Sequence, residues 1–245
     1  MFCIRGAFNK MRLAVELLLL ELIISGLRPL PVSSAQIVLL DSEQSYVSDQ
    51  NSNFLPVIFN SFEFPVTKIY CMGDSLTEAG VYETELMALL GSGWSTINLG
   101  RSGDKTSDLL ARFQADVIVP GDAAYVIIWG GIVDLYSDTA EDTEIDLQAM
   151  YTMAYDAGIK VVAVNIIPLI DISAPNKIKL LEINSWIQDT AINVDFVADA
   201  YTAVEDPGNP GNILPFYDSG DHVHLSNAGY AIVAETIYNA VTWTR

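Results

Sequence analysis

The chain has 245 residues, of which 51% are hydrophobic and 18% are charged. This much apolar material excludes an intrinsically disordered chain, and the length allows one large domain or two small ones. The 12 basic and 31 acidic residues give a formal net charge of -19, which repels both nucleic-acid backbones and anionic membrane surfaces. We therefore expect no nucleic acid among its partners and no stable membrane insertion.

The first 35 residues predict a signal peptide, and with it a secreted protein. Two basic residues precede a leucine-rich apolar run over 13–27, which is too short for a membrane span. Small residues at Ser33 and Ala35 suit a signal-peptidase site. Two glutamates inside the run are unusual for a signal peptide, so the alternative is an amphipathic helix packed on the domain of a cytoplasmic protein.

The next segment is polar and differs in composition from the rest of the chain. Residues 41–53 show neither a helical nor a strand period, which predicts a linker. We assign 36–60 to a linker or N-terminal extension and 61–245 to a folded domain. The only cysteines are Cys3 and Cys71, so we expect no disulfide and no cysteine-based metal site.

The predicted domain alternates short apolar runs with longer amphipathic segments. The short runs are rich in β-branched residues and bounded by Gly, Pro or Asp, as buried parallel strands are. We predict strands over 66–72, 95–99, 123–129, 160–166 and 195–198, and helices over 82–90, 109–113, 144–157, 176–190 and 226–241. This alternation predicts an α/β fold, a three-layer α/β/α sandwich with a five-stranded parallel sheet. Functional groups in such folds gather at the carboxyl ends of the strands.

A serine follows the first predicted strand, within the sequence Gly73-Asp74-Ser75-Leu76-Thr77. A hydroxyl at this point lies at the rim of the sheet, beside the free N–H groups of a helix N-terminus. These N–H groups can stabilise an oxyanion. The plain alternative is an ordinary helix-capping serine or threonine.

Both histidines of the chain lie near its C-terminus, in the sequence Asp221-His222-Val223-His224. If Ser75 is a nucleophile, its base must be His222 or His224, unless a lysine serves. A carboxylate three residues before His224 can turn back to its Nδ1–H and leave Nε2 to accept the serine proton. A metal site built from these residues and Asp218 is a weaker alternative, because no further histidine or cysteine completes a zinc shell.

Two glycine-containing segments follow the second and third predicted strands. They are Asn98-Leu99-Gly100-Arg101-Ser102-Gly103 and Trp129-Gly130-Gly131-Ile132-Val133-Asp134. Glycines at strand ends allow the backbone to approach a ligand closely, although plain turns would look the same.

Taken in order, these blocks resemble the GDSL/SGNH hydrolases, in their subgroup of small flavodoxin-like esterases and lipases. The resemblance covers about residues 66–241. It implies that Ser75 is the nucleophile, that His224 is the base and that Asp221 orients this histidine. It also implies an oxyanion hole from the backbone N–H groups of Ser75 and Gly100 and an asparagine side chain from the third block.

The third block departs from the family pattern at one position. The family usually has Gly-x-Asn-Asp there, and this chain has Gly131-Ile132-Val133-Asp134. Valine has no donor, and the loss of one oxyanion donor costs roughly 10²–10³ in turnover. We assign Asp74, Gly131 and Asp134 to substrate binding within this resemblance.

We therefore expect a monomeric serine esterase that works without metal or organic cofactor. Its substrates would be short-chain acyl or acetyl esters, including those of carbohydrates, hydrolysed through an acyl-enzyme. The alternative is a catalytically silent surface protein that binds carbohydrate on a retained hydrolase fold, and Val133 is the residue that supports it.

Overall fold

The computed structural model describes residues 36–38, 45–48, 54–57 and 66–244. The chain divides into two compact units, Met1–Glu63 and Phe64–Arg245. The predicted signal peptide over 1–35 and Cys3 lie outside the described residues.

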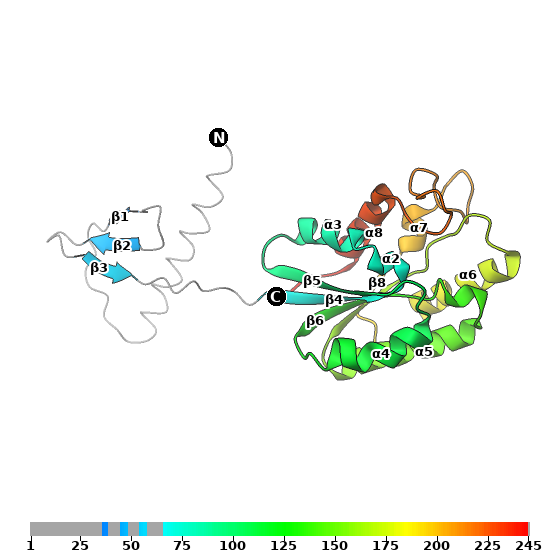
Figure 1. The fold of residues 1–245 in the computed structure, drawn as a ribbon, viewed down its shortest axis with the longest axis horizontal. Helices are drawn as coiled ribbons and strands as arrows, with labels where there is room; N and C mark the ends of the chain where they lie inside the picture. The colour runs from blue at the N-terminus through cyan, green and yellow to red at the C-terminus, as the bar shows by residue number, and fades with distance from the viewer. Residues whose placement is uncertain (1–35, 39–44, 49–53, 58–65, 245) are drawn as a thin grey trace. The chain divides into compact units, whose positions relative to one another are not determined.

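The described part of the first unit is a three-stranded antiparallel sheet (Figure 1). Its strands are β1 (Gln36–Val38), β2 (Ser45–Ser48) and β3 (Phe54–Val57). In the central strand, Val47 lies opposite Ile37 on one side and Leu55 on the other. The polar composition of 41–53 predicts a linker without strands, and β2 within this segment differs from that prediction. Strand pairing depends on residues from separate segments, which an argument from local composition does not include.

The second unit is built on a five-stranded sheet in which every neighbouring pair is parallel. The strands are β4 (Thr67–Gly73), β5 (Trp94–Gly100), β6 (Ala123–Trp129), β7 (Lys160–Val164) and β8 (Phe196–Ala198). Their order is β5-β4-β6-β7-β8, so the chain adds one strand on one side of β4 and the other three on the opposite side. The predicted α/β fold with a five-stranded parallel sheet is confirmed.

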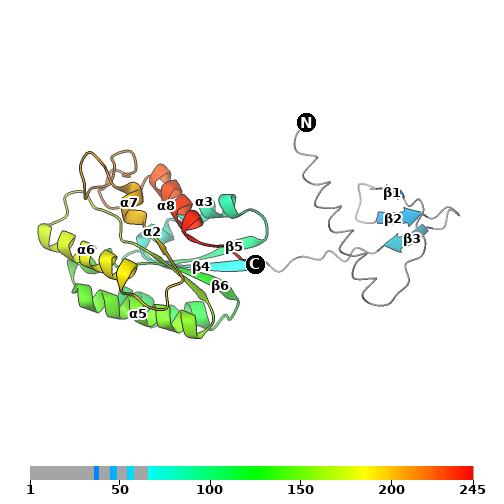
Figure 2. The ribbon, with the colours of Figure 1, turned by 180° about the vertical axis from the view of Figure 1, so that it is seen from behind.

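Helices cover both faces of the sheet and give three layers (Figures 1 and 2). Helices α3 and α8 pack together on one face, and α4, α5 and α6 lie on the other. The helices are α2 (Ser75–Glu78), α3 (Val81–Leu90), α4 (Thr106–Phe113), the π-helical η1 (Gln114–Ile118), the 3-10 helix η2 (Asp134–Tyr136), α5 (Ala140–Asp156), α6 (Ala174–Asp189), α7 (Ala200–Val204) and α8 (Asn227–Ala240).

The central strands are buried from both faces, which explains their continuous apolar sequences. Ile69 of β4, Val126 of β6 and Val162 of β7 are fully buried, and so is the free thiol of Cys71. The edge strand β5 is more exposed, and the burial of its residues is only partial. No helix in the described part of the chain has both the length and the apolar character that crossing a bilayer requires.

Strand β7 ends at Val164, two residues before the predicted end at 166. The side chain of Asn184 on α6 binds the backbone of Ile166 twice. The Ile166 N–H donates to Asn184 Oδ1 at 2.8 Å, and the Ile166 carbonyl accepts from Asn184 Nδ2 at 2.8 Å. These bonds satisfy the backbone at Ile166 in place of a neighbouring strand, so the chain leaves the sheet towards α6.

Candidate active site

The candidate nucleophile lies at the first position of α2, directly after β4. Strand β4 ends at Gly73, and Asp74 caps the helix by accepting the N–H of Leu76 at 2.9 Å. A side chain at Gly73 would collide with Thr77 and with the carbonyl of Trp129, so only glycine allows this tight turn. Ser75 therefore stands at the rim of the sheet with its N–H at the helix N-terminus, where N–H groups have no intrahelical partner.

The structure brings together the three residues that the resemblance predicts as a triad. Ser75 Oγ lies 2.8 Å from His224 Nε2, across 149 positions of sequence. His224 Nδ1 lies 2.6 Å from Asp221 Oδ2. This order of hydroxyl, imidazole and carboxylate is the arrangement in which histidine accepts a serine proton and the carboxylate holds its tautomer.

Asp221 is held as a carboxylate by several donors. Partial burial raises its pKa, but hydrogen bonds outweigh burial and lower the pKa well below its usual range. The backbone N–H groups of His224 and Val223 donate to Oδ1 at 2.7 and 3.0 Å, and Ser219 Oγ donates at 3.0 Å. Asp221 therefore stays ionised and keeps its position opposite Nδ1 of His224.

A second histidine–carboxylate pair lies in the same loop. His222 Nδ1 lies 2.9 Å from Asp218 Oδ2, and the His222 N–H donates to Asp218 Oδ1 at 3.0 Å. Sequence reasoning missed this pair, although its spacing of four residues was an available signal. Because Asp218 occupies the Nδ1 side of His222, each histidine has its own carboxylate, and it is His224 that contacts Ser75. Within the described residues, no group of three His, Cys, Asp or Glu side chains is placed to hold a metal ion.

The predicted oxyanion donor at Gly100 already has an acceptor. The Gly100 N–H donates to the side chain of Asn98 at 2.8 Å, and Asn98 Nδ2 donates to the carbonyl of Thr77 at 2.7 Å. A side chain at Gly100 would collide with the backbone of Thr77 and Glu78, so this glycine lets α2 lie against β5. To bind an oxyanion, the Gly100 N–H would have to leave Asn98, and its role in the hole stays a prediction.

The residues of the third block, Gly131 to Asp134, mainly pack against the core and cap α4 in this structure. Asp134 is 2% exposed. Both of its carboxylate oxygens accept the N–H of Thr106 at 3.1 Å, and these hydrogen bonds cap the N-terminus of α4. A side chain at Gly131 would meet Ile166 at 2.9 Å, and its φ of 106° favours glycine. Val133 is partly buried against the core. Substrate contact at Gly131 and Asp134 stays a prediction, and the burial of Asp134 disfavours it.

Asp74 is likewise buried, with 1% of its surface exposed. Its Oδ2 has no hydrogen-bond partner among the described residues. Burial raises the pKa of Asp74 to about 7, although the N–H of Leu76 lowers it and the charge of Asp134 adds to the rise. Its predicted contact with substrate is untested, and its observed role is to cap α2.

Arg112 of α4 is a residue of the site that sequence reasoning missed. Its side chain is 10% exposed, and its Nη2 donates to the carbonyls of Leu99 at 2.7 Å and Gly73 at 3.3 Å. Nε and Nη1 bind Asp104 and Asp116 at 2.9 and 3.1 Å. The guanidinium therefore joins the ends of β4 and β5 just before Asp74. A lone arginine on a predicted helix gives no sequence signal for such contacts.

Comparison with known proteins identifies the family of this chain. The family model described as "GDSL-like Lipase/Acylhydrolase family" matches residues 71–232, which is more than half of the chain. The comparison with curated proteins gives no match.

Several solved structures share the fold. A protein described as a putative lipolytic protein of the G-D-S-L family, from Desulfitobacterium hafniense, has a TM-score of 0.62 and 23% identity, covering 71% of this chain and 99% of that one. A GDSL-like lipase from Bacteroides thetaiotaomicron has a TM-score of 0.59 and 23% identity, and the match covers 71% of this chain and 86% of that one. An acetyl xylan esterase has a TM-score of 0.57 and 26% identity, and the match covers 71% of this chain and 99% of that one. With its matched span and its parallel sheet, the chain belongs to the GDSL-like lipase/acylhydrolase family of hydrolases.

Proposed function

We propose that the protein hydrolyses carboxylic esters through an acyl-enzyme formed on Ser75. The observation that carries this proposal is the continuous chain of contacts from Ser75 Oγ to His224 Nε2 at 2.8 Å and from His224 Nδ1 to Asp221 at 2.6 Å. Few structural roles require a rim serine, an imidazole and an ionised carboxylate in this order.

The proposed reaction runs in two halves. Ser75 Oγ attacks the ester carbonyl while His224 Nε2 takes its proton, and Asp221 stabilises the imidazolium that forms. His224 then protonates the leaving alcohol, and the acyl group stays on Ser75. Water enters, gives a proton to His224 and attacks the acyl carbonyl. The bond between the acyl carbon and Ser75 Oγ then breaks, His224 returns the proton to Oγ, and the acid is released.

The oxyanion would be held first by the N–H of Ser75, at the N-terminus of α2. The N–H of Gly100 is a second donor if it exchanges Asn98 for the oxyanion. The third donor of the family pattern is missing because Val133 stands at that position. We therefore expect a slow esterase, since each donor contributes roughly 10²–10³ to turnover.

We propose short-chain acyl or acetyl esters as substrates, with carbohydrate esters among them. An acetyl xylan esterase among the similar structures supports a carbohydrate ester, and the net charge of -19 disfavours strongly anionic substrates. We also propose a secreted monomer that needs no cofactor.

The test is hydrolysis of p-nitrophenyl acetate, butyrate and octanoate by the full chain, with Ser75→Ala as the matched control. We expect turnover that disappears in the variant, with acetate preferred. Turnover that is the same in Ser75→Ala would overturn the proposal, because it would have another origin.

A silent carbohydrate-binding protein is the second candidate, and the missing donor at Val133 favours it. Labelling with a fluorophosphonate separates the two, because only an activated Ser75 reacts. Val133→Asn gives a second readout. It should raise turnover by roughly tenfold or more if the hole lacks a donor, and kcat for p-nitrophenyl acetate measures this.

A further inference from the structure

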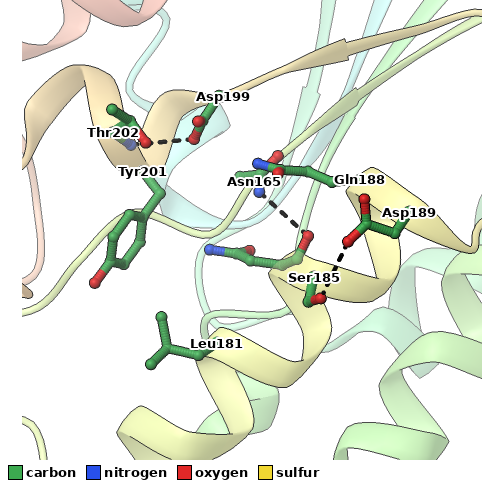
Figure 3. Close-up of a pocket in the computed structure, with 9 residues that line it drawn as sticks. Asn165, Leu181, Ser185, Gln188, Asp189, Asp199, Tyr201 and Thr202 are labelled. Atoms are coloured by element: carbon green, nitrogen blue, oxygen red, sulfur yellow. Dashed lines mark hydrogen bonds between the residues drawn. The ribbon is translucent and has the colours of Figure 1, made fainter.

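A pocket of about 240 Å³ opens where α6 and α7 meet the ends of β7 and β8 (Figure 3). Leu181, Ser185 and Gln188 reach it from successive turns of α6, and Asp199 and Thr202 come from the start of α7. Asn165, Asn184, Asp189 and Tyr201 complete the lining. None of these residues belongs to the triad, although the pocket lies at the same carboxyl edge of the sheet as Ser75.

The lining favours a neutral, polar ligand. It consists mostly of amide, hydroxyl and carboxylate groups, and it includes no Lys, Arg or His. The carboxylates of Asp189 and Asp199 repel phosphates and other anions. Leu181 and the ring of Tyr201 offer apolar surface on which one face of a small ring can pack.

The side-chain oxygen of Asn165 lacks a hydrogen-bond donor among the described residues. It is fully buried, its Nδ2 donates to the Asn184 carbonyl at 3.5 Å, and its Oδ1 has no partner among the described residues. The side-chain amide of Asn184 cannot supply one, because both of its polar atoms are bonded to the backbone of Ile166. Leaving such an acceptor unsatisfied costs roughly 1–3 kcal/mol. Because Oδ1 is itself buried, a hydroxyl donor of a ligand would satisfy it only if the lining of the pocket moves aside.

We propose that this pocket binds one neutral sugar unit of the substrate. A pyranose ring carries hydroxyl donors and acceptors around its edge and a C–H face that packs on an aromatic or aliphatic side chain. A pocket of 240 Å³ is smaller than the roughly 300–1,000 Å³ that hold drug-sized ligands, so it fits a single ring.

The position of the pocket indicates how the sugar relates to the reaction. Strand β7 is two strand spacings from β4 and strand β8 is three, so the strand ends that border the pocket lie roughly 10–15 Å from the end of β4 along the sheet edge. A sugar in the pocket would therefore belong to an acylated oligosaccharide whose ester reaches Ser75. This part of the inference rests on the proposed esterase function.

Direct binding tests the pocket independently of catalysis. Xylotriose, cellotriose and the anionic trigalacturonate are titrated into full-length Ser75→Ala by calorimetry. We expect the neutral trisaccharides to bind with millimolar or tighter affinity and trigalacturonate not to bind. If neither neutral trisaccharide binds at tens of millimolar, or if trigalacturonate binds as tightly as they do, the proposal is overturned.

Variants at exposed positions locate the binding. Ser185→Trp fills the pocket and should weaken trisaccharide binding by roughly tenfold or more. Ile178→Trp is the matched control, because Ile178 is 66% exposed on the same helix and does not line the pocket. It should leave affinity unchanged. Equal effects of the two variants would overturn the assignment of the site.

Kinetics separate this proposal from the esterase proposal. In the protein with an intact triad, Ser185→Trp should raise KM for acetylated xylotriose by a larger factor than KM for p-nitrophenyl acetate, and Ile178→Trp should change neither. If p-nitrophenyl acetate is hydrolysed and no saccharide binds, the pocket proposal fails alone. If saccharide binds and no ester is hydrolysed, the esterase proposal fails and the pocket remains.

Discussion

At the scale of single residues, backbone conformation determines which histidine meets which carboxylate. His222 has a φ of 71°, in the left-handed region that few residues other than glycine adopt. This left-handed residue belongs to one of the two histidine–aspartate pairs and lies two positions before His224 of the other. His222 binds Asp218, while His224 binds Asp221 and contacts Ser75.

Substitution of each histidine should therefore have very different effects. His224→Ala removes the group that accepts the serine proton and should lower kcat by roughly 10³-fold or more. His222→Ala leaves the triad contacts in place and should lower kcat less than about tenfold. The kcat of both variants on p-nitrophenyl acetate checks this. Equal losses would mean that His222 serves as the base.

Asp74 should make stability depend on pH. Burial raises its pKa from 3.8 to about 7, so the folded state holds the proton more tightly than the unfolded state does. The stabilisation is complete below pH 3.8 and is lost as the pH rises towards 7. Between these values it changes by roughly 1.4 kcal/mol per pH unit.

The variant that isolates this effect is Asp74→Asn, because asparagine also caps helices but does not titrate. Its free energy of unfolding, measured by urea denaturation across the same range of pH, should fall less steeply than that of the unaltered protein. Asp156→Asn, at the exposed end of α5, is the control. Identical slopes in Asp74→Asn and the unaltered protein would contradict the prediction.

At the scale of elements, the site depends on how α2 and α4 meet the ends of β4 and β5. Gly73 and Gly100 have no side chains to hold α2 away from the strands. Arg112 of α4 then binds carbonyls of both strands. The order and type of these elements follow from local sequence periods, whereas the contacts among them depend on side chains distant in sequence.

Arg112→Met should destabilise the protein by about 3–5 kcal/mol, because it leaves Asp104 and Asp116 without their buried cation. Arg101→Met is a matched control, since Arg101 is 59% exposed and its pair with Asp116 is worth at most about 1 kcal/mol. Urea denaturation measures both. A loss at Arg112 no larger than that at Arg101 would show that the buried contacts add little.

At the scale of the whole molecule, the excess of acidic residues is the dominant electrostatic feature. The formal net charge is -19. On α5 and α6, burial raises the pKa of Glu144, and the charges of Glu182 and Glu141 raise it further. Such repulsion opposes the compact state and is screened by salt.

Raising the concentration of NaCl should therefore raise the Tm by roughly a few degrees. Glu182→Gln removes one charge from the group with Glu141 and Glu144. It should raise the Tm in low salt and reduce the effect of NaCl. Thermal unfolding followed by circular dichroism checks both expectations, and a Tm that falls with added NaCl would contradict them.

The sequence by itself determined the fold class and the residues that form the triad geometry. Short β-branched strands alternate with helices, and the carboxyl ends of parallel strands share one edge, which places Ser75 and Gly100 near each other. Asp221 lies three residues from His224, within reach of a local turn. The fold class follows from local periods alone, whereas the assignment of His224 rather than His222 to the triad also rests on the family resemblance of the ordered motifs.

Only the tertiary structure decided the contacts between distant segments. It brought His224 to Ser75 across 149 positions, gave the N–H of Gly100 a competing acceptor in Asn98, and buried Asp134 where it caps α4. It also aligned α6 and α7 so that Asn165 lies in the lining of a polar pocket. These contacts depend on how side chains from separate elements pack together, and no local period in the sequence carries that information.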